Sequence, residues 1–243
     1  MKKLVLTSVC VLAVAGAAFG QGALNWQSIS AGAMTAQTNA TTFSSFTGGG
    51  ATGGAGGFNG VGGAGGAASL GTGFYYELLF TSYSGSVAAA PTSFAALATW
   101  TDSGLEASNS TTAGRLSTMN PNAGVNINGF SAGGTGNANT NSIMLVGWSA
   151  SLGSTWSLSL SNMAAGNFTL GTYFGESNRG FLQGAANGTS PGAAPFGTGA
   201  TGQGLPISSL NTQLFELQPT PEPATMALAG LGGLSLLALR RRK

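Results

Sequence analysis

Short apolar stretches separated by polar, glycine-rich stretches make up most of this chain. Residues 142–149 (SIMLVGWS) are a continuous apolar run of strand length, which predicts a central strand buried on both faces. Residues 74–80 (FYYELLF) follow a glycine cluster and are rich in aromatic side chains, which predicts a second strand. Weaker patterns predict further strands at residues 24–29, 42–46, 124–130, 167–174 and 213–217.

Two stretches have the spacing of helices. Residues 92–100 carry apolar side chains at positions i, i+3 and i+4, and residues 154–165 carry three large apolar side chains on one helical face. The second stretch also alternates as a strand would, so its periodicity leaves both structures open. Ser154, as a possible N-cap after a glycine, favours the helix.

Strands without a regular alternation of strand and helix are typical of antiparallel folds. We therefore expect residues 21–218 to form a mainly β body, an antiparallel β-sandwich that is jelly-roll-like, with one or two short helices. The glycine-rich residues 47–73 and about 184–204 are expected to be long loops, because glycine loses much conformational entropy on ordering. Complete disorder of the body is disfavoured, since the two strongest apolar runs need burial to stay soluble.

The glycine-rich segments contain chance matches to the phosphate-binding pattern G-x-G-x-x-G, for example at Gly60, Gly62 and Gly65. None of them lies between a hydrophobic strand and a helix, and no P-loop lysine follows. Residues 47–73 also lack the regularly spaced aspartates of calcium-binding repeats. No cofactor is therefore expected there.

Charge is scarce and unevenly placed. Only 6% of the residues are charged, against roughly 25% in an ordinary soluble domain, and half of these charges lie at the two ends of the chain. Between residues 21 and 218 there are two arginines and five acids, a net charge of −3, although the whole chain carries +2. Nucleic-acid binding needs clustered basic side chains, so no nucleic-acid partner is expected.

Residues 1–20 have the three parts of a secretory signal peptide. Two lysines precede an apolar run at residues 4–18, and small residues occupy the −3 and −1 positions of a cleavage site between Gly20 and Gln21. The apolar run is short for a membrane span, which needs about 20 residues. Cleavage by signal peptidase is therefore favoured over an uncleaved anchor.

Residues 219–243 form a second tripartite segment. Alternating prolines (PTPEP) precede a largely apolar run at residues 224–239, and basic residues end the chain. The prolines keep their strip extended, the apolar run predicts a short transmembrane helix, and the basic cluster is expected to stay cytoplasmic. The defining side chains are Pro221, Glu222 and Pro223, followed by Arg240, Arg241, Arg242 and Lys243.

This tail resembles the PEP-CTERM sorting signal of Gram-negative bacteria, over about 25 of the 243 residues. The resemblance implies that exosortase, a membrane-embedded processing enzyme, cleaves near the motif. The body would be exported, held for a time at the cytoplasmic membrane, and then attached to the cell surface or released. Such proteins typically occur in organisms that make extracellular polysaccharide and biofilm. The alternative is a plain single-span anchor with a proline-rich stalk.

Groups that carry chemistry are rare in the body. The chain has no histidine, and its one cysteine, Cys10, lies in the leader, so we expect no disulfide, no thiol nucleophile and no His or Cys metal site after cleavage. Paired carboxylates hydrolyse glycosidic bonds, but Asp102 and Glu106 flank a predicted turn and Glu176 lies near Arg179, as in a solvated ion pair. Calcium held by Asp102 and amide or backbone oxygens stays open. We expect no catalytic site.

Two tryptophans border polar loops, Trp26 and Trp100, and are candidates for stacking on sugar rings, whereas Trp148 ends an apolar strand and is expected in the core. The leader, the resemblance of the tail and the scarcity of catalytic groups together predict an exported cell-surface or extracellular-matrix protein with a structural or interaction role and no catalysis. The alternative is a carbohydrate-binding module that recognises exopolysaccharide. An enzyme is the third hypothesis.

Overall fold

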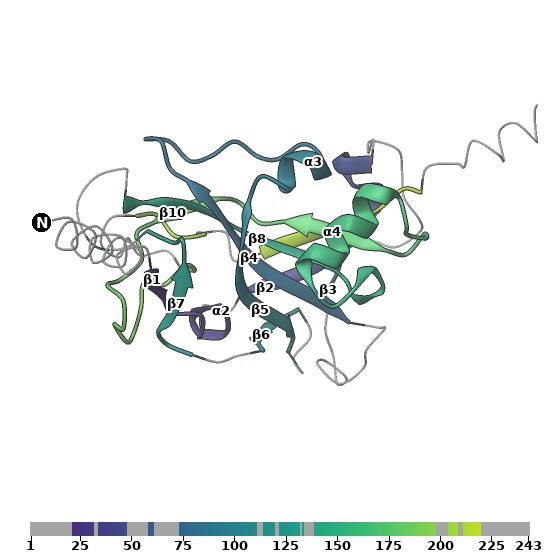
Figure 1. Cartoon of the computed structure of the whole chain (residues 1–243). Coiled ribbons are helices and arrows are strands. Elements are labelled where there is room, and N and C mark those ends of the chain that lie inside the picture. The colour runs from purple at the N-terminus through teal and green to yellow at the C-terminus, as the bar shows by residue number, and fades with distance from the viewer. Residues whose placement is uncertain are drawn as a thin grey trace, which may run out of the picture.

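The computed structural model of the chain describes residues 21–31, 34–47, 58–60, 73–110, 114–119, 122–131, 133, 139–197, 204–208 and 211–219. The predicted mainly β class is confirmed, because most elements are strands and the helices are few and short (Figure 1). The strands are β1 (Gln21–Leu24), β2 (Thr35–Phe43), β3 (Phe58–Gly60), β4 (Phe74–Ser82), β5 (Thr101–Asn109), β6 (Leu116–Thr118), β7 (Val125–Asn128), β8 (Asn141–Ser149), β9 (Tyr173–Glu176), β10 (Gly180–Leu182) and β11 (Asn211–Glu216). The helical segments are α2 (Ser28–Ala31), η1 (Ser45–Thr47), α3 (Phe94–Leu97), η3 (Ala150–Leu152) and α4 (Trp156–Ala165).

The large sheet is built around β8. All nine residues of this strand are buried, as its continuous apolar run predicts. It pairs with β4 along its whole length on one side, and with β9 and then β10 on the other. Ser177 continues the pairing between β9 and β10, because its N–H donates to the Leu145 carbonyl (2.8 Å) and its Oγ accepts from the Leu145 N–H (3.0 Å).

The predicted jelly-roll-like sandwich is not confirmed. The sheet has nine strands in the order β3-β2-β11-β9-β8-β4-β5-β6, with β10 paired to β8, whereas the second sheet has only β1 and β7. The purely antiparallel arrangement that we expected is also wrong, because β11 and β2 are parallel. A parallel pair needs a crossover between its strands. Here the crossover contains most of the body, so local sequence patterns did not reveal it.

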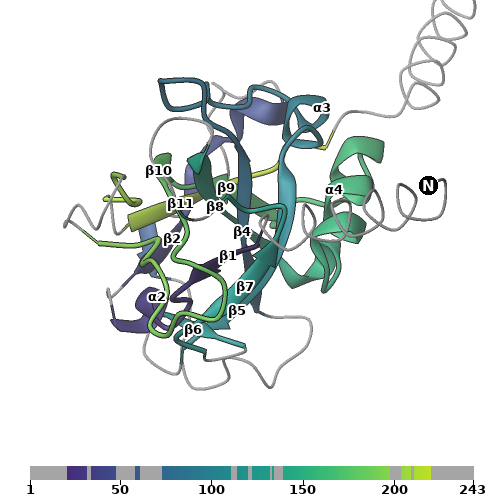
Figure 2. The ribbon, with the colours of Figure 1, turned by 60° about the vertical axis from the view of Figure 1, so that its left-hand side comes forward.

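Two apolar clusters cover the two faces of the large sheet. In Figure 2, α4 lies to one side of β4, and β1, β7 and α2 lie to the other. We call the cluster beneath β1, β7 and α2 the first core; it includes Trp26, Tyr76, Leu78, Phe130 and Leu145. We call the cluster beneath α3 and α4 the second core; it includes Leu79, Trp100, Trp148, Trp156 and Phe174. Neighbouring residues of β4 point into different cores, since side chains alternate across a strand.

The strand predictions were accurate where an apolar run was strong. The prediction at residues 74–80 matches β4, that at 142–149 matches β8, and those at 124–130 and 213–217 overlap β7 and β11. The prediction at residues 24–29 is wrong, because β1 ends at Leu24 and α2 follows. Residues 167–172 form turns before β9, and β2 begins well before the predicted residues 42–46.

Both helical predictions are confirmed in kind. The first is only the four residues of α3, whereas the second is the ten-residue α4. The N-cap of α4 is Thr155 rather than Ser154: the Thr155 Oγ1 accepts a hydrogen bond from the Leu158 N–H (3.4 Å). Gly166 ends this helix with a φ of 73°, a left-handed conformation that favours glycine.

Most of the glycine-rich residues 47–73 lie outside the described residues, but Phe58–Gly60 form the edge strand β3 against β2. Residues 184–197 follow an irregular path against β1, with isolated bridges from Ala185 to Ala23 and from Ala193 to Leu24. Within the described ranges, no helix is long and apolar enough to cross a membrane. The run at residues 224–239, for which we predicted a membrane helix, lies outside those ranges.

Candidate functional site

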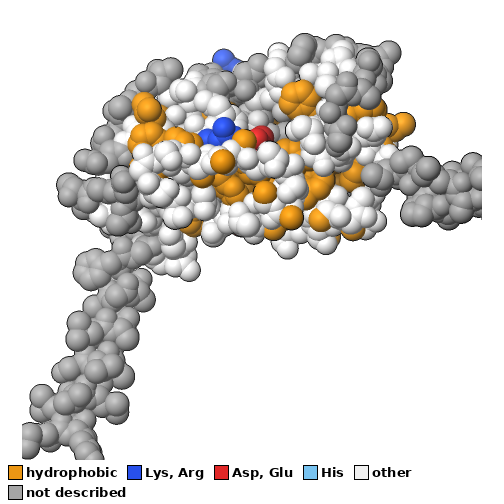
Figure 3. Space-filling view, turned by 90° about the horizontal axis from the view of Figure 1, so that it is seen from above, with side chains coloured by type: hydrophobic (Ala, Val, Ile, Leu, Met, Phe, Trp, Pro, Cys, Tyr) orange, Lys and Arg blue, Asp and Glu red, His pale blue; other side chains and the backbone are white. Residues whose placement is uncertain are grey.

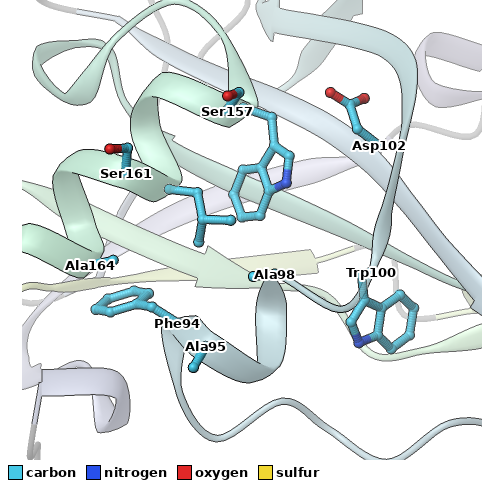
Figure 4. A pocket seen from close by; sticks show the side chains of 10 residues that line it. Phe94, Ala95, Ala98, Trp100, Asp102, Ser157, Ser161 and Ala164 are labelled. Atoms are coloured by element: carbon cyan, nitrogen blue, oxygen red, sulfur yellow. The ribbon is translucent and has the colours of Figure 1, made fainter.

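A cleft of about 430 Å³ opens between α3 and α4, on the side of the second core. Figure 4 shows that one wall comes from α3 and the other from α4, while the chain entering β5 supplies the remaining side. The side chains that line the cleft include Phe94 of α3, Ala98 at the C-cap of that helix, Ser157 and Ser161 of α4, and Trp100 and Asp102. The lining is mostly apolar, with the carboxylate and the two hydroxyls as its polar groups.

Hydrogen bonds at the helix ends hold the two walls in place. The Ser93 Oγ accepts from the Ala96 N–H (3.2 Å) at the start of α3, as Thr155 does at the start of α4. Each cap satisfies a backbone donor that would otherwise lack a partner in the first helical turn. The Asn162 side-chain amide also donates to the Leu152 carbonyl (2.7 Å), which ties α4 to η3.

The floor of the cleft is aromatic. The Trp156 ring lies 5.6 Å from that of Trp148 and 6.4 Å from that of Phe174, measured between ring centroids. Trp148 is buried, as predicted, and its indole N–H donates to the Gly153 carbonyl (2.8 Å). Trp100 is 7% exposed, so only a small part of its ring is accessible to a ligand in the cleft.

The prediction that Trp26 stacks on sugar rings is wrong. Trp26 is 0% exposed in the first core, where it lies 5.6 Å from the ring of Phe196. Its indole N–H donates to the backbone carbonyl of Glu106 (2.8 Å), so the polar group is satisfied inside the protein. The polar residues beside Trp26 indicated a surface loop, but α2 and its surroundings bury the ring. Trp100 remains a candidate because it lines the cleft.

Three acids from two strands lie next to this cleft. Register pairs Glu77 of β4 with Glu106 of β5, and Leu79, two residues further along β4, with Asp102. Leu105 and Ala107 belong to the first core, so Glu106 between them points to the opposite side of the sheet. A carboxyl cluster therefore lies on the side of the second core, with Asp102 at the cleft.

Glu77 is the most unusual of these acids. It is 1% exposed, and its Oε1 has no hydrogen-bond partner in the protein. Burial raises its pKa to about 10, helped by a hydrogen bond to the Asp102 carboxylate and by the negative charges of Asp102 and Glu106. Burial, followed by the charge of Asp102, also raises the pKa of Glu106. The raised pKa favours the protonated form of Glu77 at pH 7, whose O–H can donate to the Asp102 carboxylate.

Asp102 stands at a bulge, not at the predicted turn. The pairing of β4 with β5 shifts between Glu77 and Leu79, and Gly104 has a φ of 70° within β5. The Asp102 Oδ1 accepts a hydrogen bond from the Gly104 N–H (2.7 Å), which stabilises the bulge. The glycine was recognisable in the sequence, but only the paired strand distinguishes a bulge from a turn.

Sequence spacing did not bring Glu77 together with Asp102 and Glu106, because they lie far apart in the chain and meet only through the register of β4 and β5. The one local signal was an acid within the apolar run FYYELLF. Such an acid must be neutral or paired when the strand is buried. In the described ranges, no three His, Cys, Asp or Glu side chains form a group suited to a metal ion.

Glu176 and Arg179 lie close together, as expected, but they are less solvated than a loop pair would be. Their charged atoms are 3.8 Å apart, and the Arg179 and Glu176 side chains are 27% and 21% exposed. Burial raises the pKa of Glu176 to about 7, although the positive charge of Arg179 opposes this shift. The pair lies outside the cleft.

The two predicted processing sites flank the described fold. Gln21, which follows the predicted signal-peptide cleavage site, is the first residue of β1, and its side-chain oxygen accepts from the Asn187 amide (3.2 Å). Gly20 and all the predicted sorting residues, Pro221, Glu222, Pro223, Arg240, Arg241, Arg242 and Lys243, lie outside the described residues. The last residue that the structure describes is Pro219, two positions before Pro221.

A comparison with protein-family models matches residues 219–243 to the PEP-CTERM protein-sorting motif. The tail is a PEP-CTERM sorting signal. The resemblance seen in the Pro-Glu-Pro residues, the apolar run and the basic end is thus confirmed, and it marks the chain as an exported substrate of exosortase processing. Searches of curated proteins and of solved structures found no significant match to the chain.

Proposed function

We propose that this PEP-CTERM protein is a cell-surface or extracellular-matrix protein of a biofilm-forming bacterium, with a structural or interaction role and no catalysis. Signal peptidase would cleave between Gly20 and Gln21, and exosortase near Pro221-Glu222-Pro223. A membrane-anchored intermediate precedes release or attachment at the surface. The sorting motif supports export and processing. The first strand of the fold, β1, begins at Gln21, directly after the predicted signal-peptide cleavage site.

Processing is tested by replacing Pro221, Glu222 and Pro223 with alanine in the producing organism. We expect the precursor to keep its tail, to run at a higher mass, and to stay in the cytoplasmic membrane fraction. Pro219→Ala is the matched control, since it removes a proline of the same strip outside the Pro221-Glu222-Pro223 triplet. An unchanged mature size and location in the triple variant would show that the tail is only an anchor.

The absence of catalysis rests on the arrangement of the acids. Glu77 is buried and does not line the cleft, so Asp102 is the only carboxylate among the described lining residues. Glycoside hydrolysis needs two carboxyl groups on either side of the scissile bond. Hydrolysis of oligosaccharides by the purified body, lost in Glu77→Gln, would overturn this part of the proposal.

Carbohydrate binding is the second candidate, because the cleft combines aromatic edges with an acid and two hydroxyls. A sugar ring has apolar C–H faces, which suit the accessible edges of Trp100 and Trp156, and hydroxyl edges, which suit Asp102, Ser157 and Ser161. The test is saturable binding of the producer's own exopolysaccharide to the body. Trp100→Ala and Asp102→Asn should weaken binding at least tenfold, whereas Tyr83→Ala, which removes a half-buried ring stacked on Phe181, should not.

A further inference from the structure

The chain leaves the body at one end of the fold, which we call the exit pole: η1, residues 166–172 and residues 217–219. Two hydrogen bonds hold residues 217–218 against the body: the Leu217 N–H donates to the Thr172 carbonyl (2.8 Å), and the Gln218 N–H donates to the Thr47 Oγ1 (3.1 Å). In Figure 1 the yellow end of the described chain leaves beside α4, far from β1 at the other end of the body.

The distance from the exit pole to the membrane is short. Only residues 219–223, with three prolines, separate Gln218 from the apolar run at residues 224–239. Even proline-rich chain, which is extended, rises only about 3.1 Å per residue, so a strip of five residues can reach roughly 15 Å. The polar headgroup layer takes up about 5 to 7 Å of that length. An anchored body therefore lies against the headgroups and cannot move far from them.

The exit pole presents an exposed leucine. Leu170 is 66% exposed, more than any other large hydrophobic side chain among the described residues. Its loop is joined to the end of the chain, because the Gly171 N–H donates to the Glu216 carboxylate (2.7 Å) and Thr172 accepts from Leu217. Phe168 packs against the second core from the same loop.

The described residues of the exit pole also lack exposed charge. Residues 45–47, 166–172 and 217–219 contain no Lys, Arg, Asp or Glu. The adjacent Glu216 is 5% exposed, and its Oε1 is bonded to Gly171. Contact of these described residues with a bilayer would therefore desolvate no charged side chain among them, while it would bury Leu170. Figure 3 shows a different view of the body, in which white and orange surface greatly exceeds blue and red.

We infer that the exit pole faces the lipid bilayer in the anchored precursor and that Leu170 inserts into the interface. This inference rests on the membrane-anchored stage of the proposed function. The tail supplies the affinity, because tethering holds the pole at a high local lipid concentration, and Leu170 sets the orientation. Cleavage of the tail removes the tether and releases this contact.

The experiment uses the chain from Gln21 to Lys243 in vesicles of phosphatidylethanolamine and phosphatidylglycerol. This chain has no cysteine, so single probes can be attached at Thr169→Cys on the exit pole or at Thr189→Cys beside β1, both exposed threonines. With a polarity-sensitive fluorophore and quencher-labelled lipid, we expect at least threefold stronger quenching at residue 169 than at residue 189. Equal quenching at the two positions would overturn the inference.

Leu170→Glu in the Thr169→Cys chain should lower that quenching at least twofold, whereas Leu205→Glu, at a comparably exposed leucine elsewhere, should not change it. No effect of Leu170→Glu would overturn the role of Leu170.

Vesicle flotation distinguishes failure of the proposed anchoring from failure of the inferred orientation. If the chain does not float with the vesicles, anchoring itself is contradicted. If it floats but the probe at residue 169 is not quenched, only the orientation is contradicted. If Leu170→Glu slowed exosortase cleavage without changing quenching, the partner would be the enzyme and the lipid contact would be wrong.

Discussion

The two faces of the large sheet are built from the same strands but differ in chemistry. On β4, Tyr76 and Leu78 enter the first core, which surrounds Trp26, whereas Glu77 and Leu79 point to the other side. The first core is closed by strands, α2 and irregular chain, and the second is closed by short helices that leave a cleft. The comparison indicates that the first face is the more closely packed and contributes more to stability. The second face is packed less completely and has an accessible cleft with polar side chains.

The largest difference between the faces should come from their tryptophans. Trp26→Ala is expected to lower the free energy of unfolding by about 4 kcal/mol, because it leaves a cavity in the closed first core and removes the hydrogen bond from the indole N–H to the Glu106 carbonyl. Trp100→Ala should lower the free energy of unfolding by at least ~1 kcal/mol less than Trp26→Ala does. The space left by Trp100 opens to the cleft, so water can fill it. Urea denaturation of both variants measures this. Equal losses would mean that the second face is packed as tightly as the first.

Glu77→Gln tests whether the second face holds a neutral acid. The folded-state pKa of about 10 lies above that of an unfolded glutamate, so the folded protein binds one more proton and its stability falls as pH rises between about 4.5 and 10. Glutamine keeps the shape and cannot lose a proton. Above pH 5, the free energy of unfolding of Glu77→Gln should therefore rise relative to that of the native chain by about 1.4 kcal/mol per pH unit. This value treats Glu77 as titrating independently of Asp102 and Glu106.

Thermal unfolding at pH 5, 6, 7 and 8 measures this difference for Glu77→Gln. Leu78→Met, a volume-conserving change on the neighbouring residue of the first core, is the control and should shift stability equally at every pH. A constant difference between Glu77→Gln and the native chain would show that Glu77 is ionised in the folded protein.

The cover of the second face should depend on the cap of α4. Thr155→Ala removes the hydroxyl that accepts from the Leu158 N–H and is expected to cost about 1 kcal/mol. Hydrogen exchange should increase first in α4 and around the cleft, and not in β1 or β7. Ser161→Ala, an exposed position in the same helix, should stay within about 0.5 kcal/mol of the native chain. If exchange rose equally on both faces, the two cores would unfold as one unit.

The smallest effect is expected for Arg179→Ala. This partly exposed ion pair should contribute about 0 to 1 kcal/mol, and less in high salt. Removing the positive charge should also raise the pKa of Glu176 further above about 7, because burial then acts without opposition. A carbon-detected NMR titration of the Glu176 carboxyl checks the direction. A lower pKa in the variant would contradict the assigned roles of burial and charge.

Much of the fold could be predicted because burial leaves a local pattern. The apolar run of β8 and the aromatic run of β4 were recognised, as was the helical spacing of α4. β5 was missed because TDSGLEASN is polar, and its nine residues form a strand only between β4 and β6. At the candidate site, Trp100 and Asp102 were noted separately, while Trp26 was assigned to the surface from polar neighbours that do not determine its burial.

The sequence by itself determined the two ends of this protein: a leader that ends before Gln21 is predicted, and the PEP-CTERM sorting signal is confirmed. Both are contiguous segments whose chemistry is read directly from neighbouring residues. Only the tertiary structure decided that Glu77 meets Asp102, that Trp26 is buried, and that Leu170 lies beside the end of β11. Each of these depends on strand register and on segments that are distant in the chain, and no local pattern encodes such contacts.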